Sequence, residues 1–391
     1  MPTNKKPTTA SVRKAAPEPL RFAHPFFSSQ PPTTRAVQSP HGARMLDYVK
    51  TTLGPVPATR GDGSFALADV IGQTGAKAIE ATGRITLHVA GDTGVPEGDH
   101  ETRQVSVADA MTKDYNPASP ATSPAFFLHV GDVIYGPAPT QFLSEFYRPY
   151  MHYPGKIVAI PGNHDGESAA KLKAFQDNFC AAKQAVPAVA GSIFRETMNQ
   201  PGVYWCLDAP FVQIVGMYSN NAENPGAISG SAAGTAQKTW LVNTLKKIKA
   251  QRGSGVKKAL FFATHHPPYS SGGHTGSTQM LADIDAACTQ AGVMPNAFFS
   301  GHAHSLQRYT RTVAFDGKNL QIPYIVTGCG GHGGQVIAKA PGAAGANPLY
   351  AFGYEGWGYT RVDVTARDFT IKSYSVDWTT ITEKDSVTYN I

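Results

Sequence analysis

The stretch Asn296-Ala-Phe-Phe-Ser-Gly-His-Ala-His304 joins an apolar run to two histidines. The run predicts a short buried strand, and Gly301 predicts a turn directly after it. His302 and His304 are two positions apart, so in an extended segment both side chains point to the same face. Open α/β sheets bind ligands at the carboxyl ends of their strands. The stretch predicts two imidazoles in one pocket, although two ordinary turn residues would produce the same local pattern.

Four other segments repeat this design of an apolar strand followed by a polar side chain that can bind a metal. The strands are predicted at 84–90, 125–130, 156–160 and 257–263. The polar groups that follow them are, in order, Asp92, Asp132 with Tyr135, Asn163 with His164, and His265. Each residue taken alone has a structural explanation as a turn residue, a helix cap, a packed ring or a buried histidine. Their recurrence after five strands favours one shared site.

The chemistry of these groups indicates a site for metal ions. Carboxylate, phenol, amide and imidazole groups together suit Fe, Mn and Zn. There are enough ligands for two ions, and two ions about 3.5–4 Å apart can clamp the attacking and leaving oxygens of a displacement at phosphorus. A carboxylate carries charge and two oxygens, so it is the natural bridge between them. The sequence therefore predicts hydrolysis of a phosphate ester by metal-bound hydroxide.

Composition limits the remaining function classes. The 391 residues are 41% hydrophobic and 16% charged, which is typical of a globular chain with a substantial core. The net charge of +6 weakly favours anionic substrates. We expect a small phosphorylated substrate and no nucleic-acid partner, because no dense stripe of Lys and Arg with interleaved aromatics occurs. The oligomeric state is left open.

The sequence contains no run of 18 apolar residues and therefore predicts no membrane span. The first 30 residues have no apolar core of a signal peptide, so the default expectation is a cytoplasmic location, with export left open. The four cysteines have no CxxC spacing, which favours buried free thiols: Cys180, Cys206, Cys288 and Cys329.

The pattern of apolar and polar residues divides the chain into three parts. Residues 1–40 are rich in Pro, Ser and Thr and predict a mobile arm, residues 41–83 predict a short helical preface, and residues 84–391 predict the catalytic domain. Within this domain 96–123 is expected to be a long loop, and the last third predicts a second, antiparallel stack of strands. Helices are expected at 140–150, 167–182, 235–250 and 277–291.

The ordered motifs resemble the calcineurin-like metallophosphoesterase superfamily. They are Gly91-Asp-Thr-Gly94, Gly131-Asp-Val-Ile-Tyr135, Gly162-Asn-His-Asp165, Ala263-Thr-His265 and Gly301-His-Ala-His304. The wider superfamily usually begins with Asp-x-His. Here Gly94 occupies the third position and Tyr135 appears in the second motif, an exchange that resembles the purple acid phosphatase branch. The resemblance covers residues 84–310 and implies a four-layer α/β/β/α sandwich of two mixed β-sheets.

The resemblance also implies a role for each motif residue. One ion, ferric iron, would bind Asp92, Asp132, Tyr135 and His304, and the other, Fe(II), Zn or Mn, would bind Asp132, Asn163, His265 and His302, with Asp132 as the bridge. His164 would face the substrate phosphate as an acid or anion stabiliser. His274, nine residues after His265, would be a second phosphate-facing histidine, with His266 as the alternative. Neither the β-sandwich domain of plant members nor the family's usual Val at position 263 is present.

Three functions follow from this resemblance. The first is a purple acid phosphatase-like phosphomonoesterase, and the second is a phosphodiesterase that acts on cyclic nucleotides or phospholipid head groups. The third is a catalytically inactive scaffold on the same fold. The loops 96–123 and 328–358 are expected to decide between mono- and diesters. Gly328–Gly334 could cradle a phosphate, but it lacks the Lys-Ser/Thr of a P-loop, which favours a tight loop that lines the metal pocket.

Overall fold

The computed structural model describes residues 56–95, 101–136, 138–166, 171–220, 225–230, 234–272 and 274–391. The predicted mobile arm, residues 1–40, and the first part of the predicted preface, residues 41–55, lie outside this part of the chain. Among the helices of the described segments, none is both long and apolar enough to cross a membrane.

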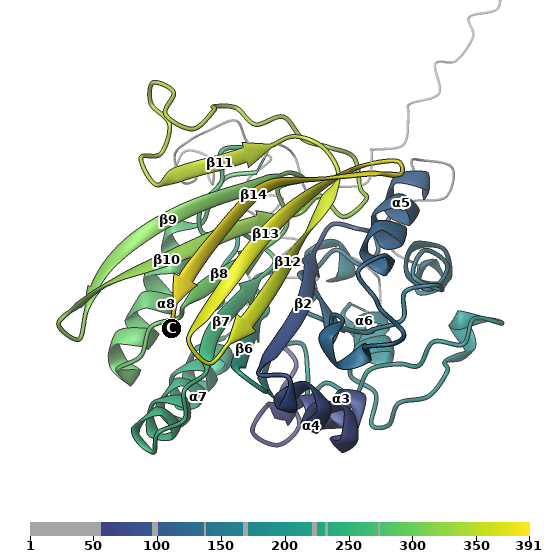
Figure 1. Cartoon of the computed structure of the whole chain (residues 1–391), viewed down its shortest axis with the longest axis horizontal. Helices are drawn as coiled ribbons and strands as arrows, with labels where there is room; N and C mark the ends of the chain where they lie inside the picture. The colour runs from purple at the N-terminus through teal and green to yellow at the C-terminus, as the bar shows by residue number, and fades with distance from the viewer. Residues whose placement is uncertain are drawn as a thin grey trace, which may run out of the picture.

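Strands make up most of the regular structure, and helices occur between them (Figure 1). The strands are β1 (Ser64–Ala66), β2 (Arg84–Ala90), β3 (Phe126–His129), β4 (Lys156–Ala159), β5 (Trp205–Ala209), β6 (Val212–Met217), β7 (Ala259–Thr264), β8 (Ala297–Ser300), β9 (Leu306–Phe315), β10 (Lys318–Thr327), β11 (Tyr350–Tyr354), β12 (Gly358–Thr365), β13 (Asp368–Asp377) and β14 (Thr380–Asn390). The α-helices are α3 (Leu67–Ile71), α4 (Gln73–Ala81), α5 (Glu101–Thr112), α6 (Lys173–Phe179), α7 (Ala236–Gly253) and α8 (Thr278–Ala291). A π-helical turn covers Leu143–Tyr147, and short 3₁₀ turns lie at Pro120–Thr122, His164–Gly166 and Ala188–Ala190.

The strands form two mixed sheets. The 8-stranded sheet has the order β1-β5-β6-β7-β8-β10-β9-β11, and the 6-stranded sheet has the order β14-β13-β12-β2-β3-β4. In the first sheet β6, β7, β8 and β10 are parallel neighbours, and in the second β2, β3 and β4 are parallel. Because parallel strands end at the same edge of a sheet, the loops that carry the motifs leave from the same end.

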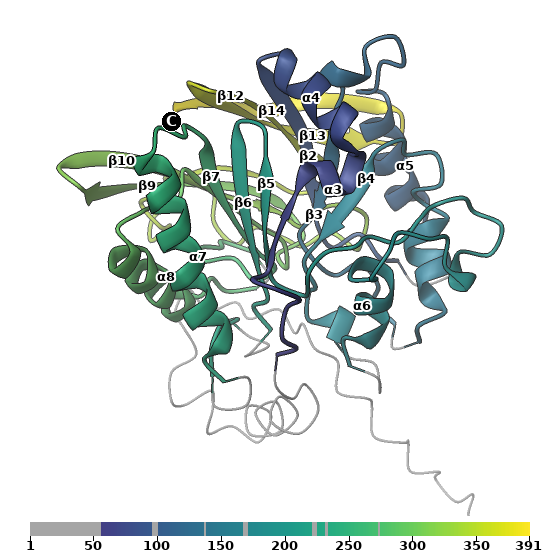
Figure 2. The ribbon, with the colours of Figure 1, turned by 90° about the horizontal axis from the view of Figure 1, so that it is seen from below.

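Successive side chains of a strand point to opposite faces of its sheet, so both faces are packed. On β7, Phe261 points between the sheets and packs on Phe369 of β13, with ring centroids 5.2 Å apart. Its neighbour Phe262 points the other way and packs near Phe298 in the cluster shared with α7 and α8. Helices α4 and α5 contact β2, β12 and β13 of the other sheet. Figure 2 shows α7 and α8 on one side of the strands and α3, α4 and α5 on the other. The predicted four-layer α/β/β/α sandwich of two mixed sheets is confirmed.

The two sheets are joined by direct contacts between the loops that follow their parallel strands. The N–H of Gly91, after β2, donates to the carbonyl oxygen of Thr327 at the end of β10, over 2.9 Å. The Nδ1 of His265, after β7, lies 2.9 Å from the carbonyl oxygen of Val130 after β3. Loops from both sheets therefore meet at one place.

Two local predictions were wrong. The segment 96–123 is not a continuous loop, because it contains α5, whose residues Val107, Ala108 and Met111 are buried. These residues form a short apolar face that the polar residues around it concealed in the sequence. The C-terminal strands do not form a stack of their own either. Strand β10 joins the sheet of β7 and β8, and β12 to β14 extend the sheet of β2, since both sheets have edges that these strands can pair with.

Candidate metal centre

Three of the predicted ligands follow strands in an unusual backbone conformation. Asp92 after β2, Asp132 after β3 and His302 after β8 have φ values of 55°, 54° and 67°. Non-glycine residues rarely adopt positive φ, although Asp and His tolerate it better than most. Such positions cost about 1–3 kcal/mol each and cluster at functional sites. The tight turn after each of these strands thus holds a side chain that can bind a metal.

The first group of side chains contains Asp92, Tyr135 and His304. The hydroxyl of Tyr135 donates to Asp92 Oδ1 at 3.2 Å and lies 3.1 Å from His304 Nε2, which is itself 3.2 Å from Asp92 Oδ1. The Nδ1 of His304 lies 2.7 Å from the carbonyl oxygen of Gly333, so Nδ1 carries the proton. Nε2 is therefore the ring atom that faces the carboxylate and the phenol, as in a metal ligand.

The second group contains Asp132, Asn163, His265 and His302. His265 Nε2 lies 3.0 Å from Asn163 Oδ1 and 3.3 Å from Asp132 Oδ2. The ligand atoms of Asp132, His265 and His302 all lie within 4.8 Å of one another, and the three residues are buried. Because His265 Nδ1 donates to Val130, Nε2 is the ring atom that faces these two oxygens, and both oxygens are acceptors. Only a cation or a proton between these atoms makes this arrangement favourable.

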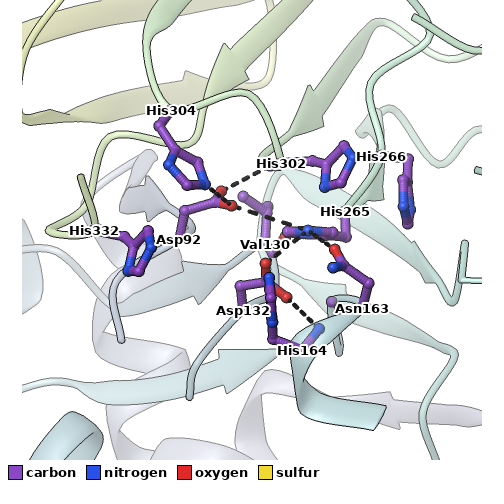
Figure 3. Close-up of polar contacts among 12 residues, drawn as sticks. Asp92, Val130, Asp132, Asn163, His164, His265, His266, His302, His304 and His332 are labelled. Atoms are coloured by element: carbon purple, nitrogen blue, oxygen red, sulfur yellow. Dashed lines mark hydrogen bonds and ion pairs between the residues drawn. The ribbon is translucent and has the colours of Figure 1, made fainter. Parts of the chain in front are cut away.

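The two groups form one buried cluster. His265 Nε2 lies 4.0 Å from Asp92 Oδ1, and the backbone N–H of His302 donates to Asp92 Oδ2 over 2.7 Å. Figure 3 shows the side chains from both sheets directed toward one another. All seven residues predicted as ligands are therefore brought together. The set of carboxylate, amide, phenol and imidazole donors fits metal ions of intermediate hardness.

Burial and neighbouring charges set the protonation of the cluster. Burial raises the pKa of Tyr135 well above its usual value, and Asp92 and Asp132 raise it further. Burial lowers the pKa of His302, as do its histidine neighbours, so this imidazole is neutral and able to bind a metal. Burial opposes the charge of His265, but the carboxylates Asp132 and Asp92 outweigh it and raise its pKa to about 9. In this arrangement the proton on His265 occupies the place that suits a cation.

The histidines predicted to face the phosphate lie beside this cluster. The backbone N–H of His164 donates to Asp132 Oδ1 over 3.0 Å. The ring centroids of His274 and His302 are 3.9 Å apart, and both ring nitrogens of His274 are buried without a hydrogen-bond partner. The alternative, His266, also lies beside His302, with ring centroids 4.2 Å apart, but Nδ1 of His266 is 2.9 Å from Ser219 Oγ. His274 thus has the greater unused capacity to bind an anion.

Sequence reasoning missed two acidic residues that hold the motif loops. The carboxylate of Asp165 accepts hydrogen bonds from the N–H groups of Val133 and Gly162, at 3.1 and 2.8 Å. The carboxylate of Glu145 accepts from the N–H of Tyr135 at 2.7 Å. Asp165 is adjacent to a motif and could have been found there. Glu145 has no local signal, because only tertiary folding places it under Tyr135.

A third residue, His332, was also missed as a site residue, although its Gly-rich loop was noticed. Its ring is stacked on the ring of Tyr135, with centroids 3.5 Å apart and an interplanar angle of 2°. A histidine inside a run of glycines was the signal that could have found it.

The fold and this cluster define a two-sheet α/β protein with a candidate metal centre at the strand ends. The chain belongs to the calcineurin-like phosphoesterase family. The model of this family matches residues 85–306, which are more than half of the sequence. A comparison with curated protein sequences finds no match.

Two solved structures resemble the fold. One is the purple acid phosphatase PPD1 from yellow lupin (Lupinus luteus) seeds, with a TM-score of 0.53 and 14% identity; the match covers 78% of this chain and 53% of that one. The other is PhoD, with a TM-score of 0.50 and 13% identity; the match covers 78% of this chain and 70% of that one. This chain thus matches only about half of the lupin protein. At these identities the likeness supports the fold alone.

Proposed function

We propose that this protein is a dinuclear-metal phosphoesterase of the purple acid phosphatase type that hydrolyses small phosphate monoesters. The observation that carries the proposal is the convergence of three buried residues, Asp132, His265 and His302, whose ligand atoms all lie within 4.8 Å of one another. Buried acceptors are not placed against one another without a cation or proton between them. Family membership supplies the reaction class, the transfer of a phosphoryl group to water.

The two groups of side chains suit two different ions. Asp92, Tyr135 and His304, together with Asp132, would hold ferric iron, since a phenolate is a hard ligand. Asp132, Asn163, His265 and His302 would hold Fe(II), Zn or Mn. When bound, such ions would supply positive charge to the phosphate oxygens and lower the pKa of a water molecule toward neutrality.

Two histidines of the chain would act on the substrate directly. His164 is anchored by its backbone N–H on Asp132, and its ring lies beside that of Tyr135, with the centroids 4.4 Å apart. His274 has two ring nitrogens without partners, so it can donate to a phosphate oxygen without losing an existing hydrogen bond. We assign both as groups that stabilise the charge developing on the phosphate oxygens, with His164 also as the candidate acid for the leaving group.

Metal analysis and two aryl substrates test this function. We expect close to two metal ions per chain, including iron with a purple phenolate-to-iron band, and faster hydrolysis of p-nitrophenyl phosphate than of bis(p-nitrophenyl) phosphate. The variants Asp132→Ala and His302→Ala should lose at least one ion and activity by at least about a hundredfold, because changes outside the ligand shell alone cost 10–100-fold. The exposed His152 provides the control variant, His152→Ala, which should match the wild type.

The possible results separate the three functions. A large preference for the diester would replace the monoesterase with a phosphodiesterase. Two bound ions without the purple band would agree with a phosphoesterase but would show that Tyr135 does not bind ferric iron. Full activity in Asp132→Ala would contradict the whole site, and absence of both metal and activity after reconstitution would favour the inactive scaffold.

A further inference from the structure

The loop Gly328–Gly334 follows β10 and lies against the motif that carries Asp92. The N–H of His332 donates to the carbonyl oxygen of Asp92 at 2.9 Å, and the N–H of Gly330 donates to that of Gly91 at 3.0 Å. Figure 3 shows the side chain of His332 on the side of the site that carries Asp92 and His304. The loop thus brings a histidine from the second half of the chain to the first motif.

The ring of His332 lies flat on the ring of Tyr135. The centroids are 3.5 Å apart and the planes differ by 2°, which is closer and more parallel than the contact of Tyr135 with His164, at 4.4 Å and 35°. His332 Nδ1 lies 2.9 Å from the carbonyl oxygen of Gly94, so Nδ1 carries the proton. The orientation of the His332 ring is therefore determined by its hydrogen bond to Gly94 and by its stacking on Tyr135.

The loop is also held from the other side. The indole N–H of Trp357 donates to the carbonyl oxygens of Gly331 and His332, both at 3.1 Å. The guanidinium of Arg103, from α5, lies 4.3 Å above the Trp357 ring. In addition to its contacts with Asp92 and Tyr135, His332 is therefore held by Trp357, which is not a predicted metal ligand.

We propose that His332 is a positioning residue that clamps the ring of Tyr135, so that its hydroxyl stays directed at Asp92 and His304. This role rests on the proposed function, in which Tyr135 is a metal ligand. Tyr135 reaches Asp92 Oδ1 and His304 Nε2 at 3.2 and 3.1 Å, and rotation of the side chain about its Cα–Cβ bond would carry the oxygen away from both. The clamp keeps the phenol in the orientation that a metal requires and lowers the entropy lost on binding.

Four variants of the full chain test the clamp. His332→Ala removes the ring and its hydrogen bond, and His332→Phe keeps a ring that can stack but cannot donate to Gly94. Trp357→Phe loosens the loop and leaves every predicted ligand unsubstituted, because it removes the indole N–H and reduces the size of the ring. His152→Ala alters an exposed histidine away from the site and is the matched control. Each apoprotein is reconstituted with Fe(III) and Zn(II), and circular dichroism checks that it is folded.

The readouts are the phenolate-to-iron absorption band and the release of iron to a chromogenic chelator. We expect His332→Ala to shift and weaken the band and to lower the affinity for the ion at Tyr135 about tenfold, at the low end of the effect of outer-shell partners. His332→Phe should restore most of the band, and Trp357→Phe should change it in the same direction as His332→Ala, by less. A folded His332→Ala protein with the band and iron affinity of the wild type would overturn the clamp.

The two proposals fail in different ways. If the wild type itself binds no metal or gives no phenolate band with Fe(III), the proposed role of Tyr135 is wrong, and the clamp is overturned with it. If the wild type gives the band and all His332 and Trp357 variants match it, only the clamp is wrong. If His332→Ala does not fold, the comparison of His332→Phe and Trp357→Phe with the wild type decides the question in the same way.

Discussion

His88 is a buried histidine whose hydrogen bonds require the neutral form. It lies on β2 and is fully buried, with Nε2 at 2.9 Å from Asp114 Oδ2 and Nδ1 at 3.0 Å from the hydroxyl of Tyr153. Tyr115 donates in turn to the Tyr153 hydroxyl over 2.8 Å. These contacts form a chain in which Nε2 donates to the carboxylate and Nδ1 accepts from Tyr153. Burial lowers the pKa of His88, and the nearby Asp114 only partly opposes this.

This chain of hydrogen bonds predicts that His88 makes the protein less stable as the pH falls below 6.5. The folded-state pKa of His88 lies below the ordinary 6.5, so its contribution is complete above pH 6.5 and is lost as the pH falls through the folded pKa. The free energy of unfolding, measured with urea at several pH values, should decrease below pH 6.5. His88→Gln should cost about 1–3 kcal/mol at pH 7 through an unsatisfied partner and should flatten this decrease. An unchanged pH slope in His88→Gln, equal to that of His152→Gln, would contradict the assignment.

At the scale of the elements, the strand-to-loop junctions explain why a glycine stands in four of the five motifs. A Cβ at Gly162, after β4, would overlap the Oδ1 and backbone nitrogen of Asp132, and a Cβ at Gly301, after β8, would overlap Asp92 Oδ2. These glycines therefore allow the loops of different strands to approach each other closely. At two of these junctions Asp92 and Asp132 have positive φ values, which the tight turn after each strand requires.

A single methyl group at such a junction should damage the site. Gly162→Ala should displace Asp132, lower the free energy of unfolding by about 1–3 kcal/mol as overpacking does, and reduce the bound metal by at least one ion per chain. The matched control is Gly253→Ala at the end of α7, where an added Cβ meets nothing within 4 Å and the substitution should stabilise the helix by up to about 1 kcal/mol. Equal metal content in both variants, by elemental analysis, would refute the close-approach argument.

At the scale of the whole molecule, the candidate centre connects the two sheets. Asp92, Asp132 and Asn163 follow strands of the 6-stranded sheet, and His265 and His302 follow strands of the 8-stranded sheet. Ions bound between these residues would link the two sheets at the ends of their strands, beyond the hydrophobic core. Unfolding would separate the ligands and release the ions, so metal binding and the stability of the entire sandwich are thermodynamically coupled.

Removal of the metal should therefore lower the stability of the entire fold. A ligand present at a hundred times its dissociation constant stabilises the native state by about 2.7 kcal/mol. Treatment with EDTA should lower the melting temperature by several degrees, and added metal should restore it. The melting temperature of Asp132→Ala should respond much less to EDTA, since this variant lacks a shared ligand. Identical melting curves of the wild type with and without metal would count against the link between the sheets.

The motif loops were largely predictable because their chemistry is local. Each predicted ligand lies directly after a strand with an apolar run, so Asp92, His265 and His302 could be assigned from short windows of sequence. The two mixed sheets followed from the motif order through a family resemblance. Helix α5 was missed because its apolar face is short, and the positions of β10 and of β12 to β14 depend on pairing over long sequence separations.

The sequence alone determined which candidate ligands follow the strands and in what order. This information is local, since strand periodicity and glycine turns act over a few residues. Only the tertiary structure decided which side chains support the site, including Glu145 beneath Tyr135 and His332 on its ring. These contacts join segments that are distant in the chain and leave no short-range pattern. They form only when the two sheets stack and bring the ends of their strands together.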